Sequence, residues 1–263
     1  MAARVRIDRL LVERGLVESR EKAARLVLAG EVFVDGERVD KAGALVPAGA
    51  DLELRGRSPY VSRGGEKLVH ARDQFRVQGA GRVCLDVGAS TGGFTDCLLQ
   101  RGATRVFAVD VGTGQLDAKL RKDPRVVVME KTNARALDVR IFGDQPTLAA
   151  IDVAFISLEK ILPSVFGVLA PRGEVLALVK PQFEVGREHV GKGGVVREPG
   201  LHRTAVSRLA RFAVLRSWHV LGVTASPLRG PKGNREFFLH ISSHGRTAAD
   251  LESRITQSVE ALA

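Results

Sequence analysis

The segment Asp86-Val-Gly-Ala-Ser-Thr-Gly-Gly-Phe94 decides the fold of this chain. It follows a short apolar run, Val83-Cys84-Leu85, and it leads into the helix-like segment Thr95-Asp96-Cys97-Leu98-Leu99. A strand, a tight turn and the start of a helix are therefore expected here. The glycines let the backbone pass close to a ligand, and the first N–H groups of the helix have no partner within it. A nucleotide-like ligand suits such a turn.

The next predicted strand ends in an acidic residue, Asp110, 22 positions after Gly88. In a βαβ unit such a carboxylate reaches the ribose hydroxyls of the ligand. The glycine spacing is G-x-x-x-G-G, which differs from the G-x-G-x-x-G of dinucleotide enzymes, and no Lys-Ser/Thr pair follows as in a P-loop. S-adenosylmethionine, which has a ribose but no pyrophosphate, is therefore the leading candidate, and a turn that serves only packing is the alternative. The residues expected to bind this cofactor are Asp86, Gly88, Ala89, Ser90, Thr91, Gly92, Gly93, Phe94, Asp110, Val111 and Asn133.

Predicted strands and helices alternate beyond this turn. The expected order is strand 105–110, helix 112–120, strand 125–129, strand 148–155, helix 157–169, strand 173–181, helix 199–216, strands 218–225 and 235–241, and a C-terminal helix. Such alternation predicts an α/β fold with a parallel, doubly wound sheet. Ligands of this fold bind at the carboxyl ends of the strands.

Length and composition limit the class of protein. A chain of 263 residues can form one large domain and one small one, and its net charge of +10 favours a polyanionic partner. No apolar segment follows the basic N-terminus and no run is long enough to span a membrane, so we expect neither a signal peptide nor a membrane protein. The two cysteines, Cys84 and Cys97, have no metal-ligand spacing, so no metal site is expected, and they indicate a reducing cytoplasm.

The first 40 residues are expected to form two helices and a hairpin. Apolar residues at helical spacing predict helices over 5–15 and 19–30, and Asp35-Gly36 predicts a tight turn between two strands. Residues 1–30 have seven Lys or Arg against four Asp or Glu. The helices could therefore face RNA, although a packing module with solvated arginines is the alternative. The basic candidates for RNA contact are Arg6, Arg9, Arg14, Arg20, Lys22 and Arg25.

This N-terminal unit resembles the small RNA-binding domain named after ribosomal protein S4, over about residues 5–55. The resemblance is carried by Arg9-Leu10-Leu11, Gly15, Ser19-Arg20, Ala23, Gly30, Val32-Phe33-Val34-Asp35-Gly36, Val39 and Lys41. We expect this domain over residues 1–57, a Gly-, Ser- and Pro-containing linker over 58–65, and a second domain over 66–263. Arg63, in the linker, is a further candidate for RNA contact.

Four charged residues occupy positions suited to chemistry. Asp152 lies in the apolar run 149–155, Lys180 ends an apolar strand, Glu236 opens the last strand, and Lys67 lies in a helix after the linker. Methyl transfer to a sugar hydroxyl needs a base that takes the hydroxyl proton. Burial and a second ammonium group nearby lower the pKa of a lysine, so that it can serve as this base. The carboxylates would orient the lysines and the hydroxyl. A buried ion-pair network without a catalytic role is the alternative.

The whole chain resembles the TlyA (hemolysin A) family of ribosomal RNA 2'-O-methyltransferases, which join this RNA-binding domain to an FtsJ-like domain. The matching segments are Gly88-Ala-Ser-Thr-Gly-Gly93 for the cofactor and, for a Lys-Asp-Lys-Glu tetrad, the surroundings of Lys67, Asp152, Lys180 and Glu236. The resemblance implies a Rossmann-like class I methyltransferase sheet and S-adenosylmethionine as methyl donor. It also implies cytidine ribose methylation in 16S or 23S ribosomal RNA and sensitivity to capreomycin-type antibiotics. The sequence gives no sign of an obligate protein partner.

Two other functions compete with this interpretation. An RNA-binding protein could keep an inactive methyltransferase fold, but the glycine turn and all four tetrad positions are intact. A membrane-active hemolysin would need a membrane span or an amphipathic cationic helix with aromatic anchors, and neither pattern occurs. Residues 187–236 have ten Lys or Arg against three Asp or Glu, which favours an RNA-facing surface. With 5% aromatic residues, recognition of RNA shape is expected rather than extensive base stacking.

Overall fold

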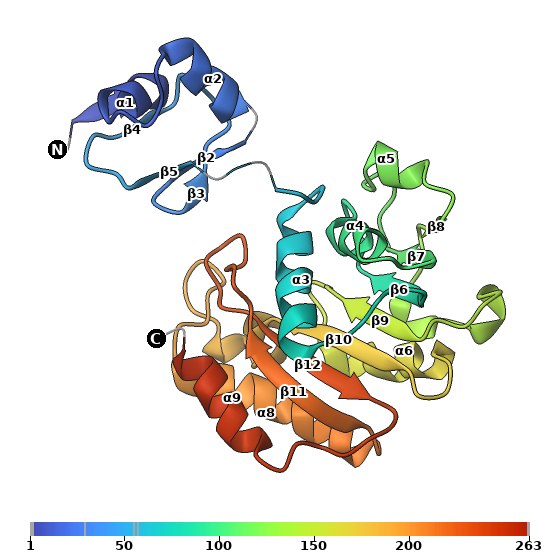
Figure 1. Ribbon diagram of the computed structural model, residues 1–263. Coiled ribbons are helices and arrows are strands. Elements are labelled where there is room, and N and C mark those ends of the chain that lie inside the picture. The colour runs from blue at the N-terminus through green and yellow to red at the C-terminus, as the bar shows by residue number, and fades with distance from the viewer. Residues whose placement is uncertain (1–2, 29, 55, 57, 262–263) are drawn as a thin grey trace. The chain divides into compact units, whose positions relative to one another are not determined.

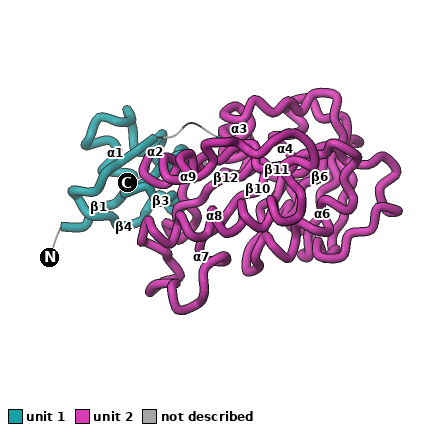
Figure 2. Tube along the Cα trace, turned by 90° about the horizontal axis from the view of Figure 1, so that it is seen from below, with its two compact units in different colours: residues 1–59 teal, residues 60–263 magenta. Residues whose placement is uncertain are grey.

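The computed structural model describes residues 3–28, 30–54, 56 and 58–261, and it divides the chain into two compact units (Figures 1 and 2). The first unit covers residues 1–59 and the second covers residues 60–263. The linker expected over 58–65 therefore overlaps the second unit, and its last three residues are helical.

The first unit packs two helices against short strands. Its elements are β1 (Arg4–Arg6), α1 (Ile7–Glu13), α2 (Arg20–Leu28), β2 (Val32–Val34), β3 (Glu37–Arg38), β4 (Leu45–Pro47) and β5 (Leu52–Leu54). Asp35 and Gly36 both have positive φ, 50° and 80°, so the tight turn predicted between β2 and β3 is confirmed. Strands β1, β4 and β5 were not predicted, because strands of three residues show too little alternation to detect.

A seven-stranded sheet in the order β11-β12-β10-β9-β6-β7-β8 forms the centre of the second unit. The strands are β6 (Val83–Val87), β7 (Arg105–Val109), β8 (Val126–Met129), β9 (Leu148–Ile151), β10 (Glu174–Val179), β11 (His219–Ala225) and β12 (Phe237–Ser242). The sheet is mostly parallel, as predicted, but β12 runs antiparallel to β10 and β11. No helix lies between β11 and β12, so the chain reverses there without crossing over.

Helices cover both faces of this sheet, as a doubly wound fold requires (Figure 1). Helices α3 and α4 pack with one apolar cluster, and α6, α8 and α9 pack with the other. The helices are α3 (Arg63–Phe75), α4 (Gly93–Gln100), α5 (Ala118–Arg121), α6 (Leu162–Val168), α7 (Pro181–Glu184), α8 (Pro199–Leu215) and α9 (Leu251–Glu260). None of the helices in the described residues is long and apolar enough to cross a membrane.

The glycine turn between β6 and α4 has the conformation that its sequence predicts. Gly88 and Gly92 have φ values of 84° and 95°, which L side chains rarely adopt. A Cβ on Gly88 would lie 2.3 Å from the carbonyl oxygen of Asp152, and one on Gly92 would lie 2.3 Å from a methyl group of Leu120. Glycine is therefore required at both positions by conformation and by space.

Asp86 stabilises this turn by hydrogen bonds to the first turn of α4. Its side chain is completely buried, and its Oδ2 accepts hydrogen bonds from the N–H and the hydroxyl of Thr95 at 2.8 and 2.7 Å. Burial raises the pKa of Asp86 to about 7. The folded protein therefore holds a proton on Asp86 at pH values where the unfolded chain has released it.

We expect Asp86→Asn to remove part of the pH dependence of stability. Between the unfolded pKa of 3.8 and the folded pKa of about 7, wild type loses stability as pH rises, because the unfolded chain ionises first. The loss is ~1.4 kcal/mol per pH unit for one group. Urea unfolding followed by Trp218 fluorescence should show the variant gaining on wild type from pH 5 to pH 7 and holding a constant difference above pH 8. A difference that does not change with pH would contradict this role of Asp86.

Candidate functional site

The carboxyl ends of β6, β7 and β8 surround a small hollow. It is lined by Ala89, Ser90, Ala108, Asp110, Gly112, Gln115, Leu116, Val128 and Glu130. Asp110 directly follows β7, and its two oxygens accept from the N–H groups of Ser90 at 2.8 Å and Gly112 at 2.7 Å. The acidic residue and the glycine turn therefore meet at one edge of the sheet.

The predicted cofactor residues divide into two groups by exposure. Ser90, Thr91, Val111 and Asn133 are exposed, and Gly88 is half-buried, so these positions can meet a ligand. Ala89, Gly92 and Gly93 are buried and supply backbone. The side chains of Asp86 and Phe94 are buried within the fold, where Asp86 binds Thr95 and Phe94 packs on Phe238, so both support the turn, and a contact of either with the ligand stays a prediction.

The residues at this edge fit S-adenosylmethionine. The carboxylate of Asp110 suits a ribose diol, and each of its oxygens can accept a further hydrogen bond. Val111, whose side chain is 73% exposed, offers an apolar surface beside it. Four further residues line the hollow that were not predicted as cofactor contacts from the sequence: Gln115, Leu116, Val128 and Glu130. The loop between β7 and β8 supplies Gln115 and Leu116 to the hollow. Residues 112–120 are predicted as a helix, but the helix that forms, α5, covers only Ala118–Arg121, so the sequence did not indicate this loop.

The four residues expected to do chemistry form two lysine–carboxylate pairs. Lys67 Nζ lies 2.6 Å from Glu236 Oε2, and both side chains are buried. Lys180 Nζ forms an ion pair with Asp152 Oδ1, and both are partly exposed. Within the part of the chain that the structure describes, Glu236 Oε1 is buried without a hydrogen-bond partner. Such an orphan acceptor is costly unless a ligand hydroxyl or water supplies the hydrogen.

The sheet topology explains why these residues converge. Asp152 directly follows β9 and Lys180 directly follows β10, and these neighbouring strands are parallel. Glu236 directly precedes β12, which runs antiparallel to β10 with Phe237 opposite Val179. Three of the residues therefore lie at one edge of the sheet, and α3 brings Lys67 to Glu236. The strand predicted over 148–155 ends at Ile151, so Asp152 lies beyond the ladder rather than within it.

The close approach of Gly88 connects these pairs to the cofactor turn. The Asp152 N–H donates to the carbonyl of Val87 at 2.9 Å, and the Asp152 carbonyl lies against Gly88. The turn that would hold the methyl donor and the carboxylate that pairs with Lys180 are therefore adjacent. Gly88 is the contact point between the two halves of the site.

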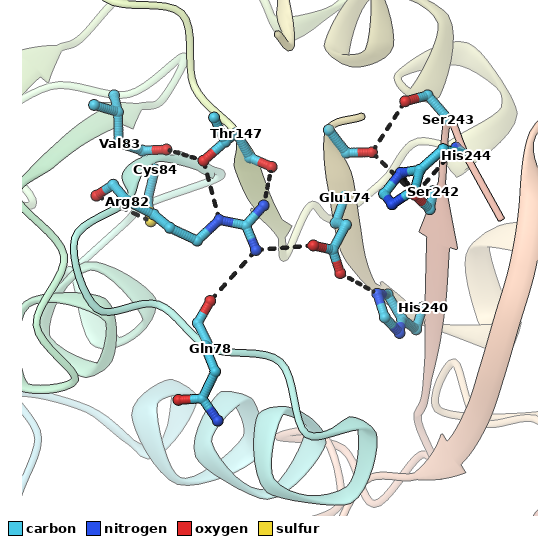
Figure 3. A network of polar contacts seen from close by, with 11 residues as sticks. Gln78, Arg82, Val83, Cys84, Thr147, Glu174, His240, Ser242, Ser243 and His244 are labelled. Atoms are coloured by element: carbon cyan, nitrogen blue, oxygen red, sulfur yellow. Dashed lines mark hydrogen bonds and ion pairs between the residues drawn. The ribbon is translucent and has the colours of Figure 1, made fainter. Parts of the chain in front are cut away.

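A second cluster of titratable groups lies at the opposite edge of the sheet (Figure 3). Glu174, at the start of β10, lies 2.9 Å from the guanidinium of Arg82 and 2.8 Å from Nε2 of His240. The hydrogen bond from His240, helped by Arg82, lowers the pKa of Glu174 to about 2. The amino ends of the strands are remote from the ligand edge, so we assign this network a structural role.

The basic residues of the first unit are partly engaged by its own acids. Arg6 and Arg20 both contact the buried carboxylate of Asp8, at 2.8 and 2.9 Å, and the hydrogen bond from Arg6 is the main reason that the pKa of Asp8 is far below its usual range. Both arginine side chains remain about half exposed, at 51% and 59%, and can still meet a phosphate. The other predicted contacts lie on α1, α2 or the loop after α1: Arg9 beside Glu13, Arg14 beside the Ala48 carbonyl, Lys22 beside Glu18, and Arg25 exposed.

Two protein families match this chain. The FtsJ-like methyltransferase family matches residues 60–243, and the S4 domain matches residues 5–52. Both domain types expected from the sequence, and the Rossmann-type fold with its N-terminal S4 domain, are thereby confirmed. The matched ranges agree with the two units of the structure.

Similar proteins extend over nearly the whole chain. The 16S/23S rRNA (cytidine-2'-O)-methyltransferase TlyA of Mycobacterium tuberculosis is 47% identical, over 98% of this chain and 98% of its own. The protein named Hemolysin A of Brachyspira hyodysenteriae is 40% identical, over 90% of this chain and 99% of its own. A solved structure described as a hemolysin, from Streptococcus thermophilus, is 44% identical with a TM-score of 0.78, over 99% of this chain and 96% of its own. The chain therefore belongs to the TlyA family of FtsJ-like methyltransferases, with an S4 domain at its N-terminal end.

Proposed function

We propose that this protein transfers a methyl group from S-adenosylmethionine to the 2'-hydroxyl of a cytidine in ribosomal RNA. The observation that carries the proposal is the pair of lysine–carboxylate contacts at the same edge of the sheet as the glycine turn and Asp110. The substrate is inferred from the name of the Mycobacterium tuberculosis relative. The S4 domain and the +10 net charge support an RNA substrate.

The residues divide the chemistry between them. The cofactor supplies a methyl group on a sulfonium sulfur, which is an electrophile. With the methyl donor bound, Nζ of Lys180 would accept the hydroxyl proton as the ribose oxygen takes the methyl group, and for this Lys180 must first have released its own proton to solvent. Asp152 then stabilises the resulting ammonium group. Lys67, held by Glu236, places a second cation where negative charge develops on the oxygen.

A conspicuous aromatic side chain lies three residues after Asp152. Phe155 is 91% exposed, has a φ of 63°, and its ring centroid lies 5.2 Å from that of Phe183. An exposed phenyl group on a residue with positive φ lowers the stability of the fold, and such residues cluster at functional sites. We infer that Phe155 stacks on a base of the RNA, which presents an unpaired nucleotide to Lys180. Sequence reasoning counted this phenylalanine as the end of a strand.

We expect Lys180→Arg to abolish methyl transfer to unmethylated ribosomal subunits, although the ion pair with Asp152 is kept. Arginine stays charged and cannot take the proton, so the rate should fall by at least ~100-fold while the affinity for the cofactor is unchanged. Lys180→Met should lose activity equally, and Lys122→Met, an exposed lysine in the α5–β8 loop, should behave as wild type. Labelled S-adenosylmethionine and nuclease mapping of the product measure the rate and distinguish a ribose methyl from a base methyl.

Two results would overturn the assignment. Full activity in Lys180→Arg would remove Lys180 from the chemistry. No transfer by wild type to either subunit, despite cofactor binding, would favour an RNA-binding protein with an inactive methyltransferase fold.

Asp110→Asn should weaken binding of S-adenosylmethionine by about 10- to 100-fold, because charge-assisted hydrogen bonds to the ribose are lost. Titration calorimetry measures this directly, without RNA. Asp138→Asn is the control: it removes a different carboxylate, which pairs with Arg140, and it should leave the affinity for S-adenosylmethionine unchanged. Equal affinities for both variants would exclude Asp110 from the cofactor site.

Phe155→Ala should lower kcat/KM for ribosomal subunits by about tenfold, since one base–aromatic stack contributes ~1–3 kcal/mol. Phe155→Trp should restore most of the activity, because its ring can stack equally well. Leu215→Ala, which truncates another exposed apolar side chain, serves as control. If alanine and tryptophan at position 155 behave alike, the ring has no part in binding the substrate.

A further inference from the structure

A second, strongly basic hollow lies in the catalytic unit and has no part in the chemistry above. We call it the basic pocket; its wall includes Arg197, Arg229, Lys232, Arg235 and His202. These residues come from two loops and the start of α8, far apart in sequence. Four cations around one hollow are unfavourable unless an anion is bound between them.

The two loops are held together by a buried asparagine. Asn234 is 2% exposed, its Oδ1 accepts from the Val196 N–H at 3.0 Å, and its Nδ2 donates to the Gly194 carbonyl at 2.8 Å. The Asn234 carbonyl also accepts from the Gly230 N–H at 2.8 Å. The wall of the basic pocket is therefore built before any ligand arrives, which lowers the entropy cost of binding.

The charges of the basic pocket are not neutralised by the protein. Across the described residues, none of its four cationic side chains forms an ion pair with a carboxylate. Burial and the neighbouring Arg229 both lower the pKa of Arg235, which shows that its charge is poorly compensated. Some exposed arginines elsewhere in this chain do have an acidic partner, such as Arg208 with Glu159 and Arg254 with Asp250.

His202 gives an independent indication of a ligand. It is 1% exposed, and its Nε2 lies 2.9 Å from the carbonyl of Val196. A carbonyl can only accept, so Nε2 carries the hydrogen and Nδ1 of the neutral ring is an acceptor. Among the described residues nothing donates to this buried Nδ1. A buried acceptor without a donor calls for a hydroxyl from a ligand or a water.

The basic pocket adjoins the Lys67–Glu236 pair. Arg235 and Glu236 are consecutive, and a Cβ on Gly230 would lie 2.6 Å from Oε1 of Glu236, so the loop 229–235 packs against that carboxylate. Arg63, predicted as an RNA contact, donates from Nη2 to the Arg229 carbonyl at 3.0 Å. A polymer bound at the catalytic edge would therefore continue into the basic pocket.

We propose that the basic pocket binds a phosphodiester group of the RNA strand next to the nucleotide that is methylated. This inference rests on the proposed function, and it adds a substrate subsite to it. Arginine forks match phosphate oxygens, and the ribose hydroxyls that flank a phosphodiester can donate to His202 Nδ1. Phosphate contacts fix the position of the strand without reading its sequence.

The test compares two double variants that remove equal charge. Arg197→Gln/Lys232→Gln removes two exposed cations of the basic pocket, whereas Lys122→Gln/Arg172→Gln removes two exposed cations from loops at the amino ends of β8 and β10. For the pocket variant we expect KM for unmethylated ribosomal subunits to rise about tenfold, with kcat and cofactor affinity unchanged. The slope of log affinity for labelled ribosomal RNA against log salt should fall by about one to two units. The control should change KM less than twofold.

The outcomes separate this inference from the proposed function. If wild type transfers methyl groups and the two variants behave alike in KM and in salt slope, the subsite is excluded and the function stands. If wild type transfers none, the function fails, and the RNA affinities of the two variants still decide the subsite: an equal loss excludes it, and a loss confined to the pocket variant supports it. Thermal unfolding of both variants checks that each is folded.

Discussion

The contact between Gly88 and the backbone of Asp152 is the constraint on which the site depends. A side chain at position 88 would overlap the Asp152 carbonyl, and the positive φ of Gly88 is itself unfavourable for other residues. The same turn brings the Ser90 N–H to Asp110. One glycine therefore sets the spacing between the proposed ribose-binding carboxylate and the proposed proton acceptor. Methyl transfer is sensitive to such spacing, because the reacting atoms must be close and aligned.

Buried charge explains why the catalytic edge is built as pairs. Lys67 and Glu236 are both removed from water, which costs several kcal/mol per ion unless each has a partner. Each carboxylate holds its lysine side chain in a fixed position at the end of an apolar sheet. The second network, around Glu174, uses the same principle at the other edge, where it ties β10 and β12 to the start of β6. Ion pairs therefore stabilise the structure near the amino ends of the parallel strands and, as we propose, take part in the chemistry near their carboxyl ends.

Strong local signals made most of the fold predictable from sequence. The glycine turn, the acidic end of β7, and the apolar runs of β9 and β10 each depend on neighbours in the sequence, and each was found where expected. The strand expected over 235–241 was also found, as β12, but its reversed direction was not predicted, because direction in a sheet depends on which strand the chain meets in space. In the site, Lys67, Asp152, Lys180 and Glu236 were selected as polar residues at the ends of apolar strands or by resemblance. The positions of Gln115 and Phe155 at the site were missed, since they depend on loop conformations that carry no periodic pattern. The basic excess over 187–236 was noted from the sequence, but its gathering into one pocket was not.

The position of β12 between β10 and β11 affects how the sheet is completed during folding. Among the described strands, β11 pairs only with β12, and one side of β10 has no partner until β12 is in place. Until β12 is in place, β10 and β11 each have a strand edge without a partner, and such edges are prone to pair with other chains. Glu236 enters the sheet edge with the strand that closes this gap. A chain that ends before β12 therefore lacks both the strand that joins β10 to β11 and the carboxylate that pairs with Lys67.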